Sequence, residues 1–374
     1  MARLLAGVVV LLMMLHKGRS AVPAGRSEHA IAVGAATRRF VVRTPEGRAV
    51  SSVVLLLHGS TRHDGADELS PVRFLEGEIS VQTSVWSGEG AMLVYLAGRE
   101  VGDGSGQFCW GAGTDNNLCT APRAGKQDES FLLAVLDWLK EQNSTYGGAA
   151  VPAYLYGHSG GGRMTWRAAC NSTIAQRFAA VFPTSALLAA ELRQEDGARC
   201  DVSRMPRIMI THGTRDRTTD ISFAEDSVEW AADAAACSTK TIVSGVGQDP
   251  VGELVRYSDC SRAQSGFEIA YYRLQDYGHR VPPQFWYKRA WDFFSGHDPT
   301  EPSSASASAS PSSALPTLSL AASAGTAAAT TAAASQMGGS WRQRLQWHHL
   351  GLVLTCAVFV VFLSRTHKHA LLYG

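Results

Sequence analysis

The chain lacks an excess of charge of either sign. Its 374 residues include 34 Lys and Arg against 33 Asp and Glu, which gives a formal net charge of +1 at pH 7. A protein without a strong global field is not drawn to nucleic acid or to acidic surfaces. The balance of charge therefore argues against a nucleic-acid-binding function.

The sequence also lacks the spacings that bind metals, with no Cys-x-x-Cys motif and no His-rich pattern of the kind that holds zinc. We therefore expect no metal ion and no organic cofactor. Six of its seven cysteines lie in the central part of the chain, at Cys109, Cys119, Cys170, Cys200, Cys237 and Cys260. An even number in an exported protein indicates three disulfides, although six cysteines allow fifteen pairings.

Apolar runs are short and lie near the two ends. Residues 4–15 are apolar, follow a single basic residue, Arg3, and precede small residues. Such a run is too short to span a bilayer and is typical of a cleaved secretory signal. We predict a signal peptide over residues 1–24, with cleavage between Ser20 and Gly25.

The C-terminal part has no globular composition. Residues 302–336 consist mostly of Ser, Ala, Thr and Pro, which cannot bury enough apolar surface to offset the entropy of ordering. This predicts a disordered stalk over residues 297–345. The apolar segment Leu350–Leu363 and the basic residues after it predict a membrane anchor with a short basic tail over residues 346–374. A single-pass span is favoured over a lipid-anchor signal, because such signals usually end in the apolar run.

Two glycosylation sequons, at Asn143 and Asn171, are also consistent with export. These features together place the protein in the secretory pathway. We expect it at the extracellular face of a membrane, or secreted.

The body of the chain, residues 30–296, has no Pro/Ser-rich break and no internal repeat, so one domain is the simplest interpretation. Amphipathic stretches such as residues 128–142 separate short apolar runs that are typical of buried strands. These runs lie at residues 52–59, 91–98, 152–159, 177–184, 206–213 and 267–274. Their alternation predicts an α/β fold with a mostly parallel central sheet and helices on both faces.

The stretch "YLYGHSGGGRM", residues 154–164, contains a serine in the Gly-x-Ser-x-Gly pattern of a nucleophile elbow. The pattern alone is weak in a chain with 36 glycines. Its context is stronger, because an apolar strand ends at Gly157 and a helix is predicted after Ser159. We expect Ser159 to be a nucleophile, while a turn that only packs a helix on the sheet remains the alternative.

A serine nucleophile needs a basic histidine and an acid that orients it, and in hydrolases of this kind both follow the serine in the order acid, then histidine. Asp216 follows one predicted strand and His279 follows the last one. Asp220 and Asp276 compete with Asp216 for the role of the acid, but one lies farther along its loop and the other is too close to His279. We expect the remaining nearby histidines, His58, His158 and His212, to be structural.

An oxyanion in the transition state needs hydrogen-bond donors. The backbone N–H of Gly160, directly after the serine, is expected to be one of them. The other is expected from the loop after the strand "VVLLLHGST", where the Ser60 N–H is favoured and Thr61 is the alternative.

Over residues 38–295 the chain resembles the secreted esterases that group with feruloyl esterases and polyhydroxybutyrate depolymerases in the α/β-hydrolase fold. The motifs that carry the resemblance are "VVLLLHGST", "RIMITHGTRD", "YYRLQDYGH" and, most specifically, the helix after the serine with the segment "RFAAVFPTSA". The resemblance implies Ser159 as nucleophile, Asp216 as acid and His279 as base. It also implies disulfides between Cys109 and Cys119, Cys170 and Cys200, and Cys237 and Cys260.

The chain departs from this family after its histidine. The family commonly has Gly-His-x-Trp-Pro, whereas this chain has Val281 at the position of the tryptophan. The departure concerns the wall that binds the acyl group and not the three site residues. A double acid of the family corresponds to Asp128 and Glu129, which we expect to cap a helix that begins near residue 129.

The resemblance implies a serine carboxylic ester hydrolase that is similar to feruloyl esterases and acts on esters, including those attached to a polysaccharide or a polyester. Alternatives of the same fold are a polyhydroxyalkanoate depolymerase, an acetylxylan-type esterase and a peptidase of the prolyl-oligopeptidase kind, which the lack of a propeller-sized region disfavours. An alternative of another class is a catalytically silent adhesion or receptor module. Aromatic side chains expected near the mouth of the site are Trp110, Tyr277, Phe285 and Trp286.

Overall fold

The computed structural model describes residues 25–62, 67–101, 105–112, 124–142, 151–193, 200–247 and 249–297. The predicted signal peptide and anchor, the stalk beyond residue 297, Cys119 and Asn143 lie outside these ranges. Within them, no helix combines the length and the apolar character needed to cross a bilayer.

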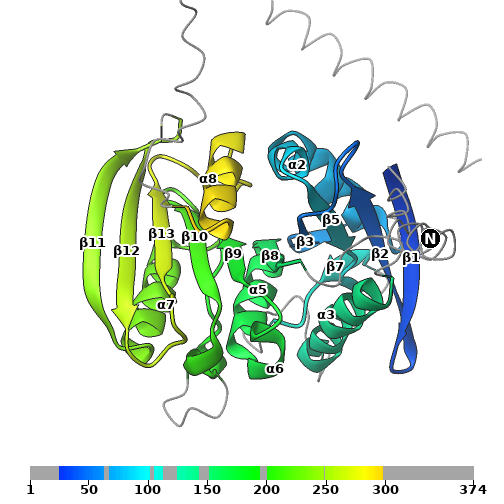
Figure 1. The fold of residues 1–374 in the computed structure, drawn as a ribbon, viewed down its shortest axis with the longest axis horizontal. Coiled ribbons are helices and arrows are strands. Elements are labelled where there is room, and N and C mark those ends of the chain that lie inside the picture. The colour runs from blue at the N-terminus through cyan, green and yellow to red at the C-terminus, as the bar shows by residue number, and fades with distance from the viewer. Residues whose placement is uncertain are drawn as a thin grey trace, which may run out of the picture. The chain divides into compact units, whose positions relative to one another are not determined.

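A ten-stranded sheet organises the described residues, in the order β1-β2-β5-β3-β8-β9-β10-β13-β12-β11 (Figure 1). Its six central strands pair in parallel throughout. They are the six strands that the apolar runs predict: β5 (Ala91–Leu96), β3 (Ser52–Leu57), β8 (Ala153–His158), β9 (Ala180–Thr184), β10 (Arg207–Gly213) and β13 (Ile269–Leu274). All but a few of their residues are buried, as expected for strands covered on both faces.

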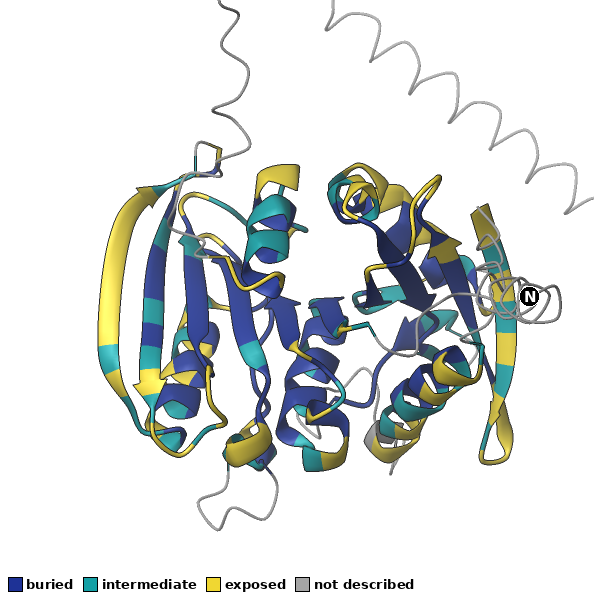
Figure 2. Cartoon of the chain, viewed as in Figure 1, coloured by how far each residue is buried: buried dark blue, intermediate teal, exposed yellow. Residues whose placement is uncertain are grey.

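Antiparallel hairpins close both edges of the sheet. One is formed by β1 (Gly25–Val33) and β2 (Ala36–Thr44), the other by β11 (Cys237–Val246) and β12 (Gly252–Cys260). None of these four strands was among the predicted ones. The outermost strands, β1 and β11, are mostly exposed (Figure 2) and so lack the continuous apolar runs that reveal the central strands.

Helices cover both faces of the sheet (Figure 1). Helices α2 (Ser70–Gly88) and α8 (Gln284–Phe294) pack together on one face, over an apolar cluster that includes Trp86 and Trp286. The cluster on the other face includes Phe131, Met164 and Val228, from helices α3 (Ala124–Glu141), α5 (Gly160–Cys170) and α7 (Ile221–Ala234).

The shorter elements lie between these strands and helices. Helix α6 (Ser172–Ala175) follows α5, and two short 3₁₀ helices cover Ala190–Leu192 and Val202–Arg204. Three short strands, β4 (Thr61–Arg62), β6 (Arg99–Glu100) and β7 (Gln107–Cys109), form a second small sheet in the order β4-β7-β6.

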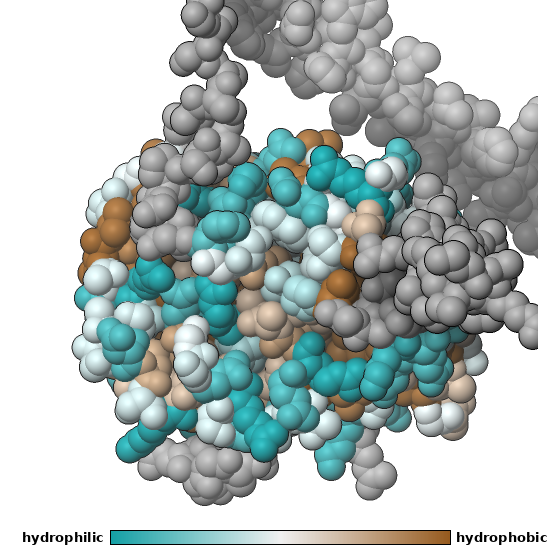
Figure 3. Space-filling model, viewed as in Figure 1, coloured by the Kyte–Doolittle hydropathy of each residue, from teal (hydrophilic) through white to brown (hydrophobic). Residues whose placement is uncertain are grey.

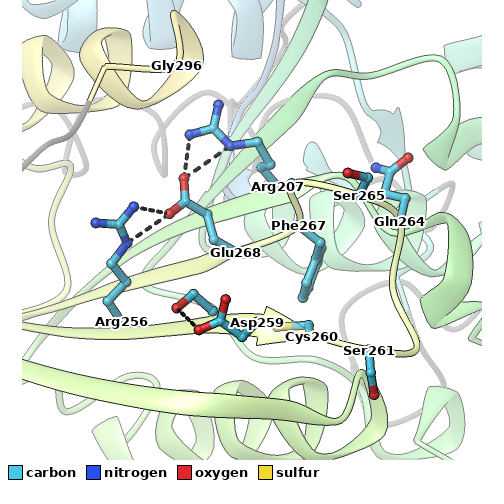
Figure 4. Close-up of a pocket in the computed structure, with 12 residues that line it drawn as sticks. Arg207, Arg256, Asp259, Cys260, Ser261, Gln264, Ser265, Phe267, Glu268 and Gly296 are labelled. Carbon is cyan, nitrogen blue, oxygen red and sulfur yellow. Dashed lines mark hydrogen bonds and ion pairs between the residues drawn. The ribbon is translucent and has the colours of Figure 1, made fainter.

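A buried glutamate ties three strands together at the amino-terminal edge of the parallel sheet. Glu268, just before β13, accepts hydrogen bonds from Arg207 of β10 and from Arg256 of β12, the latter with Nε–Oε2 and Nη2–Oε2 distances of 2.8 and 2.6 Å (Figure 4). These side chains line an open pocket of about 710 Å³. Since both arginines pair with the same carboxylate, we interpret the group as a structural link between strands β10, β12 and β13.

Candidate active site

Ser159 occupies the sharp turn between β8 and α5, with φ and ψ of 53° and −117°. A positive φ is unfavourable for a residue with a Cβ and persists only where the surrounding structure enforces it. The glycines allow the turn: a Cβ on Gly157 would lie 2.2 Å from the Gly161 carbonyl oxygen, and one on Gly161 would lie 2.4 Å from the Leu57 oxygen. The strand and the helix therefore cross closely enough to hold Ser159 at the carboxyl end of the sheet.

Three predicted site residues form one hydrogen-bonded chain. His279 Nε2 lies 2.9 Å from Ser159 Oγ, and His279 Nδ1 lies 2.7 Å from Asp216 Oδ2. The other carboxylate oxygen, Oδ1, accepts the backbone N–H groups of Thr218 and Thr219, at 2.9 and 2.8 Å. The loops after β8, β10 and β13 thus bring together residues far apart in the sequence.

The charge state of Asp216 determines which nitrogen of His279 carries the proton. Burial opposes the ionisation of Asp216, but hydrogen bonds from His212, His279 and the Thr219 N–H outweigh it and hold its pKa well below the usual range. An ionised carboxylate only accepts hydrogen bonds, so His279 Nδ1 must be the donor. This leaves Nε2 free to accept the proton of the Ser159 hydroxyl.

The two competing acids have other partners. Asp220 caps helix α7 by accepting the Ser222 N–H at 3.0 Å. Asp276 forms an exposed ion pair with Arg215, with a distance of 2.9 Å between Nη2 and Oδ1. Of the three candidates, the structure places Asp216 against His279.

Three further histidines, His58, His158 and His212, lie near these hydrogen-bonded residues. His58 is buried, accepts the Gly98 N–H on Nε2 at 2.8 Å and lies 2.6 Å from the Gly59 carbonyl oxygen through Nδ1. The ring of His158 lies 5.1 Å from that of His279, and burial lowers the His158 pKa to about 3.

His212 does more than fill space. Its Nε2 lies 2.8 Å from the Thr219 carbonyl oxygen and 3.3 Å from Asp216 Oδ2. The contact with Asp216 was not predicted from the sequence. The available signal was the separation of four residues between His212 and Asp216, directly after a strand.

The predicted oxyanion donors lie side by side. A Cβ on Gly160 would lie 3.1 Å from the Ser60 nitrogen, and one on Gly59 would lie 3.3 Å from Ser159 Cβ. Thr61, the alternative donor, belongs to β4 and pairs with Phe108. Within the described ranges, no hydrogen bond from the N–H of Ser60 or Gly160 to another residue is present.

A buried hydrogen-bond network supports the loop after β3, which carries Ser60. The Trp110 indole donates to the His58 carbonyl oxygen at 2.9 Å, and the next residue, Gly111, donates its N–H to Asp128 Oδ2 at 2.7 Å. Asp128 Oδ1 in turn accepts from Arg38 Nη1 at 2.7 Å.

The expectation that Asp128 and Glu129 cap a helix was therefore wrong. Helix α3 begins at Ala124, so both acids lie inside it. Asp128 pairs with Arg38 of β2, and Glu129 binds Arg167 of helix α5 at 2.8 Å. Both bonds join α3 to elements that carry or support the site.

The aromatic residues expected near the mouth are only partly there. Trp110 and Trp286 are 1% and 0% exposed and belong to the two apolar clusters. Tyr277 is half-buried and donates its hydroxyl to the Val281 carbonyl oxygen, whereas Phe285 is 37% exposed. The two tryptophans are core residues and are closed off from solvent.

Two of the expected disulfides are present, Cys170–Cys200 and Cys237–Cys260. Cys109 is also disulfide-bonded, and its expected partner Cys119 lies outside the described residues. At the sequon residue Asn171, the side-chain oxygen caps helix α6 through the N–H groups of Thr173 and Ile174. No group of three or more His, Cys, Asp or Glu residues that could hold a metal ion occurs in the described part of the chain.

Comparison with known proteins identifies the fold. No protein-family model and no curated protein sequence matches the chain. Among solved structures, an acetyl xylan esterase from Aspergillus awamori is 16% identical, with a TM-score of 0.50, over 72% of this chain and 99% of that one. Esterase 2 from Thermogutta terrifontis is 13% identical, with a TM-score of 0.47, over 75% and 97%. A lidless α/β serine hydrolase from Xanthomonas campestris is 12% identical, with a TM-score of 0.41, over 69% and 87%. The chain has the α/β-hydrolase fold.

Proposed function

We propose that the protein is a serine carboxylic ester hydrolase in which Ser159 is the nucleophile, His279 the general base and Asp216 the orienting acid. The observation that supports this most directly is the hydrogen-bonded chain from Asp216 through His279 to the Ser159 hydroxyl. A neutral serine hydroxyl is a weak nucleophile, and a histidine held in the correct tautomer by an ionised acid is what activates it.

The reaction has two steps. As Ser159 Oγ attacks the ester carbonyl carbon, His279 Nε2 takes the hydroxyl proton, and the oxyanion is stabilised by the N–H groups of Gly160 and Ser60. Collapse of the tetrahedral intermediate breaks the bond to the alcohol, which leaves with the proton from His279. Water, deprotonated by His279, then attacks the acyl-enzyme, and the acid is released as Ser159 recovers its proton.

For the substrate, we propose aryl or short-acyl esters, with hydroxycinnamoyl esters of plant-type polysaccharides first and hydroxyalkanoate polyesters second. The sequence resemblance supports this order, and the acetyl xylan esterase among the structural neighbours adds acetylated polysaccharides as an alternative. We also propose that the enzyme acts outside the cell, held by an anchor in residues 346–374 or released. The disulfides support an oxidising compartment.

Labelling with a fluorophosphonate and assays of ester hydrolysis test the proposed nucleophile. Wild-type protein should be labelled at Ser159, and Ser159→Ala should lose both the label and at least about three orders of magnitude in kcat. Ser80→Ala, which alters an exposed serine of helix α2, is the control and should retain both. Neither label nor hydrolysis in the wild-type protein would instead favour the silent adhesion module, whereas labelling with cleavage of peptides alone would favour a peptidase.

The acid is tested by a matched pair of substitutions. Asp216→Asn should lower kcat by about three to four orders of magnitude, because an amide no longer holds His279 in the required tautomer. Asp220→Asn should leave kcat within a few-fold, since Asn caps a helix as well as Asp does. Equal losses in the two variants would contradict the assignment of Asp216. Methyl ferulate, p-nitrophenyl butyrate, a hydroxybutyrate oligomer and acetylated xylan then rank the substrates.

A further inference from the structure

Besides its backbone nitrogen, Ser60 has a second polar atom, its hydroxyl oxygen, close to the turn that carries Ser159. A Cβ on Gly160 would lie 2.6 Å from Ser60 Oγ, closer than the 3.1 Å to the Ser60 nitrogen. The hydroxyl and the N–H of Ser60 therefore lie on the same side of Gly160, whose own N–H is the other proposed donor. Both polar atoms of Ser60 therefore lie close to Gly160, the residue directly after Ser159.

The Ser60 hydroxyl has no other task in the described part of the chain. Neither a hydrogen bond nor an ion pair engages its Oγ there, and the residue is half-buried. A hydroxyl in this setting can donate its proton to a bound group without breaking a hydrogen bond to any of the described residues. An available donor loses less on binding an anion than one that must first leave a protein partner.

The loop that carries Ser60 is held in place by hydrogen bonds at His58, two residues before Ser60. The carbonyl oxygen of His58 accepts the Trp110 indole N–H, and the His58 ring bridges the Gly98 N–H and the Gly59 carbonyl oxygen. Gly59 itself lies against Ser159 Cβ. The position of Ser60 relative to the nucleophile is thus fixed before a substrate binds, as electrostatic stabilisation of a transition state requires.

We propose that the Ser60 hydroxyl is a third donor to the oxyanion, in addition to the N–H groups of Ser60 and Gly160. This inference rests on the proposed ester hydrolase function. The hydroxyl donates a hydrogen bond to the oxygen that was the ester carbonyl as negative charge develops on it. No covalent bond forms at Ser60, and its proton remains on Oγ. A hydrogen bond to a charged oxygen is about twice as strong as one to a neutral carbonyl, so the contact accelerates the reaction more than it tightens substrate binding.

The first test is Ser60→Ala, assayed with p-nitrophenyl butyrate. Loss of one oxyanion donor typically costs about 100- to 1000-fold in kcat, and a donor on a rotatable side chain should lie at or below the lower end of that range. We expect kcat to fall by roughly 10- to 100-fold, with KM nearly unchanged. A kcat close to that of the wild-type enzyme would overturn the proposal.

The second test separates the hydroxyl from the shape of the side chain. Thr and Val have nearly the same shape, but only Thr retains a hydroxyl, so Ser60→Thr should turn over clearly faster than Ser60→Val. Equal rates for these two variants, with a slow Ser60→Ala, would show that Ser60 acts through packing alone and would refute the proposal. This comparison remains informative if Ser60→Ala folds poorly, because Thr and Val add the same branching and nearly the same bulk at position 60.

A third measurement uses an inhibitor that forms an oxyanion. A trifluoromethyl ketone adds to Ser159 and places a negatively charged oxygen among the donors, so its affinity should weaken in Ser60→Ala by about the same factor as kcat. An unchanged affinity counts against the hydroxyl. Fluorophosphonate labelling of Ser159 in the wild-type protein distinguishes a failure of the proposed function from a failure of this inference alone. Its absence would mean that the proposed function fails, whereas labelling with a fully active Ser60→Ala would mean that only this inference fails.

Discussion

At Asp216, four donors approach a single carboxylate. His279 and His212 share Oδ2, and the N–H groups of Thr218 and Thr219 share Oδ1. The sequence predicted Asp216 and His279, because an acid and a histidine after late strands are typical of this chemistry. It did not predict the contact with His212, since a histidine near a strand end is usually structural and only the folded turn shows which oxygen it meets.

The stability of the protein should depend on His158 in mildly acidic solution. The pKa of His158 is about 3 in the folded protein, against 6.5 for an exposed histidine. Below about pH 6.5 the unfolded chain takes up a proton that the folded protein does not accept, so stability falls as the pH is lowered toward 3. Above pH 6.5 this contribution is constant.

We therefore expect His158→Gln to lose less free energy of unfolding between pH 7 and pH 5 than the wild-type protein does. The loss attributable to His158 should approach about 1.4 kcal/mol for each pH unit below 6.5. Urea unfolding at the two pH values measures it. An identical pH dependence in the variant would show that His158 is protonated as readily in the folded state as in the unfolded one.

Among the elements, the sequence revealed the strands that are buried on both faces and missed the edge hairpins, whose strands are exposed or only partly buried. Central strands such as β3 and β8 are continuous apolar runs and were predicted, whereas the exposed edge strands β1 and β11 were not. Asp128 and Glu129 were misread for a different reason. Their partners, Arg38 and Arg167, are distant in the sequence, and a single sequence contains no record of which distant residues pair.

The crossing of β3, β8 and α5 has a sharp steric requirement. A Cβ on Gly161 would approach the carbonyl oxygens of Leu57 and His58 within 2.6 Å. Neither oxygen can move without shifting β3 or the loop after it that carries Ser60. Gly161→Ala should therefore reduce kcat by at least about tenfold, because a displacement of about 1 Å in an active site is costly.

Gly77→Ala is the matched control. Gly77 lies in the exposed part of helix α2, and a Cβ added there would meet no atom within 4 Å. Alanine at this position should keep full activity and raise the free energy of unfolding by about 0.5–1 kcal/mol, through its better helix propensity. Measurements of kcat and of urea unfolding for both variants test these expectations. Full activity of Gly161→Ala would mean that β3 and α5 can move apart without any loss of kcat, which would contradict the prediction.

For the molecule as a whole, the sequence predicted the meeting of Ser159, Asp216 and His279 better than it predicted the walls around them. The order of Ser159, Asp216 and His279 along the chain reflects the order of the strands, so it can be read without a structure. The walls around an acyl group cannot be read in this way. Trp110 and Trp286 looked like candidates for an aromatic mouth, yet both are packed in the core. Burial depends on how elements meet, which the identity of a residue does not reveal.

The two hairpins at the edges of the sheet differ in one respect. Both outer strands are exposed, and β11 displays the apolar side chains of Ile242 and Val243 at an edge where Figure 3 shows hydrophobic surface. Only the β11–β12 hairpin is closed by a disulfide, which links Cys237 to its register partner Cys260. The β1–β2 hairpin contains no cysteine.

This difference should appear as unequal local opening of the native state. Hydrogen–deuterium exchange followed by mass spectrometry should find the β1 amides exchanging faster than those of β11, because the cross-link limits how far β11 can separate from its neighbour. The double substitution Cys237→Ser and Cys260→Ser should accelerate exchange in β11 and leave β1 unchanged. If β11 exchanged first in the intact protein, transient fraying would begin at the cross-linked edge, and its apolar side chains would then be the first to meet other chains at high concentration.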